Sequence, residues 1–469
     1  MTTRAIRHGL ALAAATALIA ADAGAAPVIR LPVPGGNPQA IDFATDPVLA
    51  FGRTAAPIGP FLAALGNAVA AHPAVQAAIA DGAASRAVRT QVRAGLFPQV
   101  SAQVTASRAL ARNFATTTTV VESLTPRGRT DIGLNGSQLL YDFGATGSRI
   151  AASDDRIRAA QADVERIAGE TELRAVAAYY DVLTFQTLVA ISAASVARQR
   201  EILSDVRVRV THGVGADSDT ARVEAAVADT DAQTARFDRQ LGQARARYRE
   251  AFGANAPPLL ARCTPPRSTA VSLDAAATLA RRSPSVAVAL HLADAARRTA
   301  RAARADGLPR LSAGLDATRY DAFTGNNDYE VRATVGLRLN LFAGGRQRGV
   351  IEEARAQARS AALAADRIAG ESDRDATAAF TDVAALERVT ATLETAYIAD
   401  RRSRDAYVEQ FRVSRGSLIE LLRAEQSYAQ AATSFIQSVV DLDVARYALL
   451  LRTGEVLDAT GISVAATAL

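Results

Sequence analysis

An internal duplication runs through most of this 469-residue chain. The pentapeptide Arg166–Glu170 (RIAGE) recurs unchanged at residues 367–371, a shift of 201 positions. Pro73 returns as Pro284, a shift of 211 positions. Two constant shifts, 201 and 211, indicate two copies of one unit with a longer loop in the first copy. Because a repeated unit decides the architecture of the whole chain, each structural pattern should occur in both copies.

The composition favours long, closely packed helices over large globular cores. Hydrophobic residues make up 49% of the chain but aromatic residues only 5%, and there is no Trp. Alanine-rich, aromatic-poor sequence is typical of packed helices. All 53 basic residues are Arg, and 48 acidic residues are interleaved with them. The sequence therefore has no one-sided basic stripe for nucleic acid, and we expect none to bind.

The chain contains a single cysteine and four histidines. Cys263 has no second cysteine with which to form a disulfide bond within the chain. The histidines are scattered without the spacing of metal ligands. The sequence therefore predicts no metal site and no cofactor.

The N-terminus has the three parts of a secretory signal peptide. Two arginines precede a largely apolar run, Leu10–Ala21, and the small residues Ala23–Ala25 follow it. This order predicts a signal peptide over residues 1–25. No cysteine follows the apolar run, so we expect no lipid anchor. An extended arm rich in Pro and Gly is expected over residues 26–60.

Each copy changes from helical to strand periodicity after a proline, Pro98 in the first copy and Pro309 in the second. Apolar and polar residues then alternate, which places one face of a strand in an apolar medium and the other in water. A polar loop joins two such strands in each copy. The predicted strands cover about 98–111 and 130–142, and about 309–319 and 330–342.

A proline-free helical stretch of roughly 65 residues follows each hairpin and, at 1.5 Å per residue, is on the order of 100 Å long. A glycine turn ends each stretch, and a second helix returns. The predicted fold class is mostly α with β, built from a helix–β-hairpin–helix–helix unit that occurs twice. The expected boundaries are a first repeat over 61–255, a linker over 256–271, a second repeat over 272–456 and a tail over 457–469.

Four amphipathic strands cannot close a barrel, and open sheet edges are not tolerated in lipid. Bacterial outer-membrane barrels begin at about eight strands. The strands must therefore be pooled between subunits or form a sheet in water. A periplasmic coiled-coil structural protein is the alternative without a pore, and it gives two apolar-faced hairpins no role.

Short motifs that occur in the same order twice resemble the TolC-like outer membrane efflux protein family over nearly all of the mature sequence. They lie before the first strand of each repeat, after the second strand and at the helical turns: residues 95–98 and 307–309, 137–144 and 339–345, 213–219 and 416–422. The resemblance implies a homotrimer in which three chains of four strands form a 12-stranded barrel in the outer membrane. A long α-helical tunnel would continue into the periplasm.

The resemblance also implies partners. These are a periplasmic adaptor (membrane fusion) protein, an inner-membrane ABC or proton-driven transporter, and outer-membrane lipid.

In this family the periplasmic entrance is closed by helices near the two tip turns. Asp219 resembles the gate carboxylate of the first repeat, and Glu420 resembles a position in an acidic ring. Alternatively, both residues serve as helix-start residues that satisfy free N–H groups and the helix dipole. The glycines of the tip turns are Gly213, Gly215 and Gly416.

Other tip positions depart from the family pattern. Phe411 stands where the gate tyrosine can sit, so the hydroxyl hydrogen bond would be lost. Gly416 falls at the usual arginine position, with Arg415 beside it, and Arg423 replaces a second acidic ring residue. These departures imply an altered gate and a constriction that prefers cations less strongly.

Enzyme motifs are not found in the sequence. The glycine-rich run at 344–349 fits neither the dinucleotide spacing nor the P-loop, which needs a lysine that the chain lacks. The sequence also has no nucleophile elbow and no paired His–Glu zinc signature. We therefore predict a passive export duct and no enzyme. The missing lipid-anchor cysteine favours type I protein secretion, and multidrug or metal efflux is the alternative.

Overall fold

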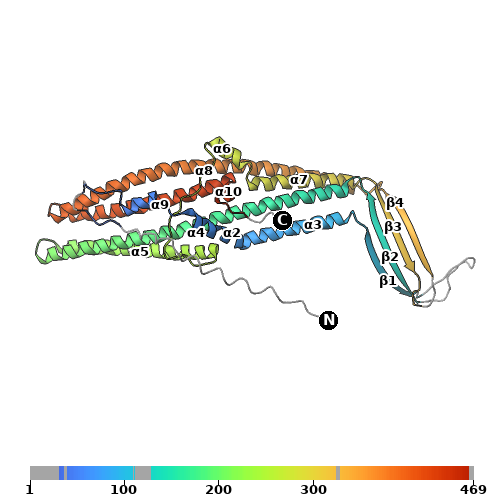
Figure 1. The fold of residues 1–469 in the computed structure, drawn as a ribbon, viewed down its shortest axis with the longest axis horizontal. Helices are drawn as coiled ribbons and strands as arrows, with labels where there is room; N and C mark the ends of the chain where they lie inside the picture. Colours follow the sequence, from blue (N-terminus) through green and yellow to red (C-terminus); the bar gives the residue numbers. More distant parts are fainter. Residues whose placement is uncertain are drawn as a thin grey trace, which may run out of the picture.

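The protein forms a long rod with a β-sheet at one end and two helical turns at the other (Figure 1). The structure, a computed structural model, describes residues 31–35, 38, 40–108, 110, 128–323 and 328–463. The predicted signal peptide and most of the first polar loop lie outside these residues. The prediction of a mostly helical chain is confirmed.

The chain passes twice through the same series of elements. The first pass contains α2 (Ile58–Ala71), α3 (Pro73–Ala94), β1 (Gln99–Arg108), β2 (Gly128–Tyr141), α4 (Ala145–Thr211) and α5 (Asp217–Phe252). The second contains α6 (Leu273–Ala280), α7 (Pro284–Ala305), β3 (Arg310–Arg319), β4 (Tyr329–Arg338), α8 (Arg346–Arg412) and α9 (Leu418–Thr453). Two short helices, α1 (Pro47–Arg53) and α10 (Val456–Thr460), flank them. Helices α4 and α8 have 67 residues each, and α5 and α9 have 36 each.

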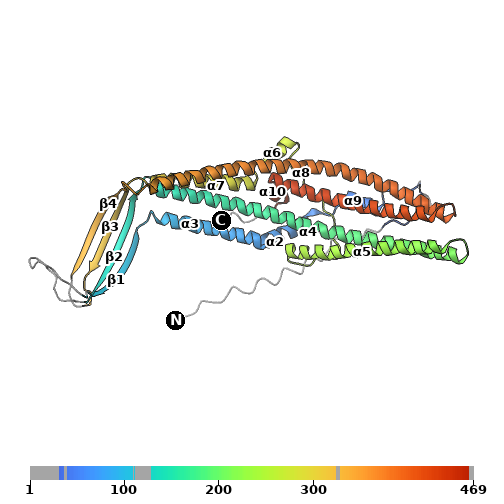
Figure 2. The same ribbon diagram turned by 180° about the vertical axis from the view of Figure 1, so that it is seen from behind.

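The two long helices begin in the same way. Gly144 and Gly345 precede α4 and α8 with φ of +84° and +83°, a conformation that favours glycine. No proline follows inside either helix, so nothing interrupts the backbone hydrogen bonds. Figure 2 shows both helices running most of the length of the rod.

The four strands form one antiparallel sheet in the order β1-β2-β3-β4. One row across the sheet is polar, and the adjacent row is apolar: Ser101, Asn135, Asp316 and Arg332, then Ala102, Leu134, Ala317 and Val331. The apolar face is uncovered in the single chain, where Val104 is 67% exposed. Within the described residues, the outer edges of β1 and β4 pair with no strand.

Several predicted boundaries differ from the structure. The arm expected over 26–60 contains α1 and the start of α2, because the Asp46 carboxylate accepts the N–H groups of Val48 and Leu49 and begins a helix. The strand expected over 330–342 ends at Arg338. The last partner on β3 is Arg310, so residues beyond Arg338 have nothing to pair with.

Other boundaries shift by a few residues. The strand expected over 98–111 is observed as β1, whose bounds are Gln99–Arg108. The helix expected to lead up to Pro98 is divided at Pro73 into α2 and α3, which meet at a bend of 51°. The tail expected to begin at residue 457 starts inside α10.

The main core lies midway along the rod, where the long helices meet α1, α2 and the segment between the two repeats. Its largest fully buried side chains include Tyr180, Tyr397, Tyr428 and Phe435. The expected linker over 256–271 is fixed to this core, since the Arg262 guanidinium lies 2.6 Å from the Asp443 carboxylate.

Among the described residues, α4 has the length and composition of a membrane-crossing helix, and so does the bent α2–α3 pair if it is taken as one span. In α4, however, 56% of the most apolar stretch is buried inside the protein. Such burial is typical of a core helix, which passes the same test of length and hydropathy.

Candidate functional site: the helical tips

The turn between α4 and α5 closes the first helical hairpin. Gly213 has φ of +73°, and its N–H donates to the Val210 carbonyl at 2.9 Å. The N–H of Val214 donates to the Arg209 carbonyl at 2.9 Å, so the turn caps the last carbonyls of α4. A Cβ atom on Gly215 would lie 3.0 Å from the Val210 side chain, and the turn is therefore tight at that position.

The turn between α8 and α9 repeats this geometry with different residues. Ser414, 201 positions after Gly213, has φ of +58°, an unfavourable conformation for a residue with a side chain. The N–H of Arg415 donates to the Gln410 carbonyl at 2.8 Å. A Cβ atom on Gly416 would come 2.9 Å from the backbone nitrogen of Phe411, so only glycine fits without a shift.

Within one chain, Asp219 contacts residues of its own helix start. Its carboxylate accepts the Ala216 N–H at 3.4 Å and lies 3.5 Å from the Arg222 guanidinium. Glu420 is exposed in the first turn of α9. Both carboxylates therefore stand where they satisfy a helix N-terminus.

Phe411 is held by a residue that the sequence analysis did not single out. The Arg209 guanidinium carbon lies 4.0 Å from the centre of the Phe411 ring, and its Nη2 donates to the Phe411 carbonyl at 2.9 Å. A tyrosine hydroxyl is thus not needed to join the last turn of α4 to the last turn of α8. In the sequence, Arg209 looks like an ordinary basic residue near a helix C-terminus.

A small apolar cluster also joins the two hairpins at the tip. Its buried members come from all four helices: Ile202, Val206, Val223, Val408, Leu418 and Leu421. Phe411 packs against this cluster. The predicted residues Arg415 and Arg423 lie outside it and are exposed.

Behind the tip, buried charges link α4, α8 and α9. Arg404 is 2% exposed; its guanidinium lies 2.6 Å from the Asp405 carboxylate and 3.8 Å from Glu425. The Arg198 guanidinium of α4 reaches the Glu425 carboxylate at 3.3 Å. Burial raises the pKa of Glu425, and the two arginines oppose that rise.

The N-terminal segment is bound to the same hairpin. Arg404 donates to the Pro32 carbonyl at 3.0 Å, and the Gly35 N–H donates to Asp405 at 3.2 Å. Further along, the Tyr397 hydroxyl donates to Asp46 at 2.9 Å, and Arg401 pairs with the same carboxylate. Polar contacts of Pro32, Gly35 and Asp46 therefore connect the segment before α1 to α8.

An open groove runs above the tip, lined by α4, α5 and α9. Its lining mixes hydroxyl and amide side chains, such as Ser192 and Gln233, with apolar ones, such as Ile191 and Phe237. Arg423 also lines the groove, whereas Glu420 does not. The groove thus presents a mixed polar and apolar surface, and one of its charges is a predicted constriction residue.

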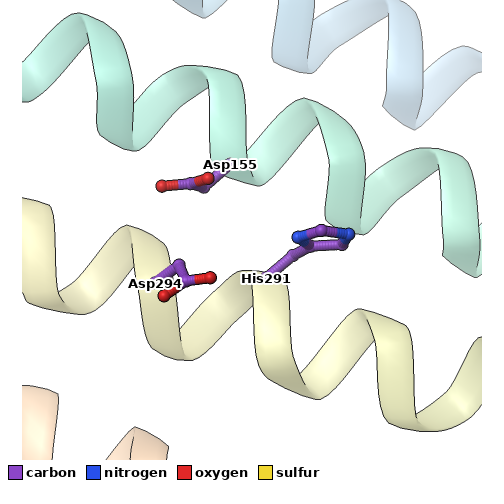
Figure 3. A group of neighbouring side chains, drawn as sticks. All are labelled: Asp155, His291 and Asp294. Carbon is purple, nitrogen blue, oxygen red and sulfur yellow. The ribbon is translucent and has the colours of Figure 1, made fainter.

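The structure also brings one histidine near two carboxylates, which sequence spacing alone did not reveal. His291 and Asp294 of α7 face Asp155 of α4 (Figure 3), and their ligand atoms lie within 4.8 Å of one another. Asp155 already pairs with Arg158 at 2.6 Å and with Arg298, and Asp294 pairs with Arg297. A cation there would have to displace arginines, so we regard the group as an ion-pair network between α4 and α7.

Comparisons with known proteins agree with this architecture. The model of the family "Outer membrane efflux protein" matches residues 64–254. The outer membrane efflux protein BepC of Brucella suis biovar 1 (strain 1330) is 24% identical over 339 residues, which cover 71% of this chain and 74% of BepC.

Two solved channels share the fold. The outer-membrane channel OprN superposes with a TM-score of 0.76 at 21% identity, covering 87% of this chain and 92% of OprN. The Campylobacter jejuni CmeC outer membrane channel has a TM-score of 0.76 at 13% identity, covering 91% of this chain and 94% of CmeC. Together with the duplicated helices and the hairpin sheet, these similarities show that the chain has the fold of outer-membrane efflux channels and that its residues 64–254 match the outer membrane efflux protein family.

Proposed function

We propose that the protein is the homotrimeric outer-membrane exit duct of a tripartite export system. The observation that carries this proposal is a four-stranded sheet with one apolar face, one polar face and two open edges. Three copies would supply twelve strands, enough to close a barrel and remove every edge. The apolar face would then meet lipid, and the polar rows would line a water-filled lumen.

The helices support the same arrangement. Helix α4 packs chiefly against α2, α3, α5, α7 and α9, whereas α8 packs against α6, α7 and α9. Helix α8 thus lacks two neighbours that its counterpart has. In a cyclic assembly, α3 and α5 of the next subunit would occupy those places, and β4 would pair with β1 of that subunit.

The tips are the proposed entrance. Val214, in the turn between α4 and α5, is 76% exposed, which suits docking of a periplasmic adaptor protein. An inner-membrane ABC or proton-driven transporter would supply the energy, since the chain carries no motif for nucleotide chemistry. Asp219, Phe411, Arg415, Glu420 and Arg423 are the residues we propose for the gate.

Arg209 adds an intrachain restraint to this gate. By holding Phe411 through its ring face and its carbonyl, it ties the α8–α9 hairpin to α4. Opening would require the hairpins to separate. We therefore place Arg209 with the proposed gate residues.

We propose two candidate classes of exported cargo. Type I protein secretion is our first candidate. Small-molecule efflux, of drugs or metals, is the second, and it is favoured by the curated relative, which is named an efflux protein.

Fractionation tests the duct itself. We expect the protein in outer membranes as a trimer that dissociates only on heating in detergent. A salt-extractable monomer in the periplasm would contradict the proposal and favour the periplasmic coiled-coil structural protein.

A gene deletion separates the cargoes. Loss of specific proteins from the culture medium with unchanged drug and metal susceptibility would support type I secretion. Increased susceptibility with an unchanged secretome would support efflux.

A further inference from the structure

The repeated pentapeptide lies at a junction of three elements in the first copy. A Cβ atom on Gly169 of α4 would come 2.9 Å from the Leu451 side chain and 3.1 Å from that of Val456, so the end of α9 sits directly on this glycine. Gly454 ends α9, and a Cβ atom on it would lie 3.0 Å from the Cα atom of Ser283 at the start of α7. The pentapeptide thus contacts the end of α9, which in turn contacts the start of α7.

The second copy has the corresponding glycines and proline, but in the described part of the chain they do not contact one another. Gly370 of α8 occupies the position of Gly169, and a Cβ atom there would meet nothing within 4 Å. Gly253 ends α5 with φ of +68° and also has open space around it. Pro73 begins α3 as Pro284 begins α7. The three elements of a second junction are therefore present. They are α8 at Gly370, the end of α5 and the start of α3, and within one chain the two glycines have open space around them.

We infer that Gly370 is the point at which α8 receives the end of α5 and the start of α3 from the next subunit. This inference depends on the trimer proposed above and adds the residues that would meet. The glycine allows close approach of a helix end, as Gly169 does within the chain. Its occupant is a second copy of this chain.

The charges around the pentapeptide support this partner. In the first copy, Arg166 bridges two carboxylates of its own helix, Asp163 and Glu170, each at 2.8 Å. In the second copy, Arg367 pairs with Glu371 at 2.6 Å, but the position equivalent to Asp163 is Ala364.

A carboxylate is present instead on α5, the helix that would pack against the second pentapeptide. The residue equivalent to Leu451, which covers Gly169, is Glu250 at the end of α5, and it is exposed. Arg367 is exposed over 61% of its side chain. An acidic residue is therefore absent from α8 and present on α5, the helix that would pack against it. This is the charge complementarity expected between two subunits.

Cysteine cross-linking tests the contact in the full-length trimer with Cys263→Ala as background. The pair Gly370→Cys and Glu250→Cys should give linked dimers and trimers on a non-reducing gel, with no larger species. The matched pair Gly169→Cys and Leu451→Cys should give only a monomer of altered mobility. A trimer that assembles without the first cross-link would overturn this inference and leave the proposed function standing. Absence of any trimer would overturn both.

Charge reversal provides a second measurement without cysteines. Arg367→Glu should lower the temperature at which the trimer dissociates in detergent, and Glu250→Arg in the same chain should restore it. Arg348→Glu, on an exposed part of α8 distant in sequence from the pentapeptide, is the control. An unchanged dissociation temperature for Arg367→Glu, or no recovery in the double variant, would count against the contact.

Discussion

Helices α4 and α8 have equal length and share a pentapeptide, yet they are stabilised by different surroundings. Helix α4 has buried residues along its length from Ala145 to Val206, whereas α8 buries only Ala354, Ala365, Ala376, Tyr397, Arg401, Arg404, Asp405 and Val408. Helix α4 is enclosed by neighbours from its own chain, and α8 is open on one side. Packing within the chain therefore stabilises α4, whereas in our proposal α8 also needs packing against another subunit.

The difference is visible at matched positions. Ala162 of α4 is 8% exposed, and Leu363, its counterpart 201 positions later, is 62% exposed. A large apolar residue at an open position is unfavourable in a monomer and favourable in an interface. The comparison therefore gives matched variants that should fail in different ways.

The largest expected effect comes from placing a charge at these two positions. Ala162→Glu would bury an unpaired carboxylate and cost more than about 5 kcal/mol, comparable with the whole stability of an ordinary domain. Leu363→Glu should leave the helices folded and prevent the trimer. Circular dichroism reports folding, and gel mobility with and without heating reports assembly. If Leu363→Glu formed stable trimers, the proposed interface on α8 would be wrong.

A second contrast concerns the acidic residues that lie two positions beyond the end of each pentapeptide. Glu172 of α4 is fully buried, and neither of its carboxylate oxygens has a hydrogen-bond partner. The neighbouring Thr460 hydroxyl donates to the Val456 carbonyl instead. Burial raises the pKa of Glu172 to about 8. Its counterpart Asp373 is partly exposed and pairs with Arg281 at 2.8 Å.

Glu172 should therefore make stability depend on pH. Its folded pKa lies above its unfolded value of 4.5, so the folded state holds the proton between these values. Stability is highest below pH 4.5 and falls as the pH rises through about 8. Glu172→Gln should remove a cost of about 5 kcal/mol above that range. Thermal melting at pH 5 and pH 9 measures the effect. Equal pH dependence in wild type and variant would refute it, and Asp373→Asn is the control.

A third prediction concerns the buried charges near the tip. Arg404 stands where α4 has Leu203, and Asp405 stands where α4 has Ser204. Arg404→Leu should cost roughly 3–5 kcal/mol, because it removes the cation paired with the buried Asp405 and leaves Glu425 with Arg198 alone. Adding Asp405→Ser copies the residues of α4 and should recover part of the loss. A double variant less stable than the single one would contradict this account.

Arg209→Ala tests the tie between the two long helices at the tip. It removes a cation–π contact and a charged hydrogen bond, together worth about 1–3 kcal/mol. We expect normal trimers with higher single-channel conductance in planar bilayers. The matched Gln410→Ala variant on α8 should leave conductance unchanged. Wild-type conductance for Arg209→Ala would mean that the contact does not restrain the entrance.

Asp219→Ala should have the smallest effect on stability, about 1 kcal/mol, since the carboxylate satisfies one N–H at an exposed helix start. If the carboxylate also holds the entrance shut in the trimer, conductance should rise. A loss of stability with unchanged conductance would leave only the helix-start role.

Much of the fold could be predicted because its signals are local. Two-residue alternation located the strands, and long proline-free stretches between glycines located α4 and α8. The errors occurred where a distant partner decides the outcome. Strand β4 ends where β3 offers no further residue, and α1 forms because Asp46 caps it while Tyr397 and Arg401 hold that carboxylate.

The candidate site was predicted less completely. Sequence position identified the two turns and Phe411, but Arg209 lies 202 residues from Phe411 along the chain. Nothing in the local pattern around Arg209 distinguishes it from other arginines near helix ends. Likewise, Arg404, Asp405 and Glu425 look like solvated helix residues until α4, α8 and α9 enclose them.

By itself, the sequence determined the duplication, the element types and their order, because periodicity and turn residues act over a few positions. Only the tertiary structure decided which copy of a repeated element is enclosed. The equal pentapeptides in α4 and α8 meet unequal surroundings, since Gly169 contacts the end of α9 and Gly370 faces open space. Burial is a property of neighbours, and neighbours hundreds of residues apart are set by packing rather than by local pattern.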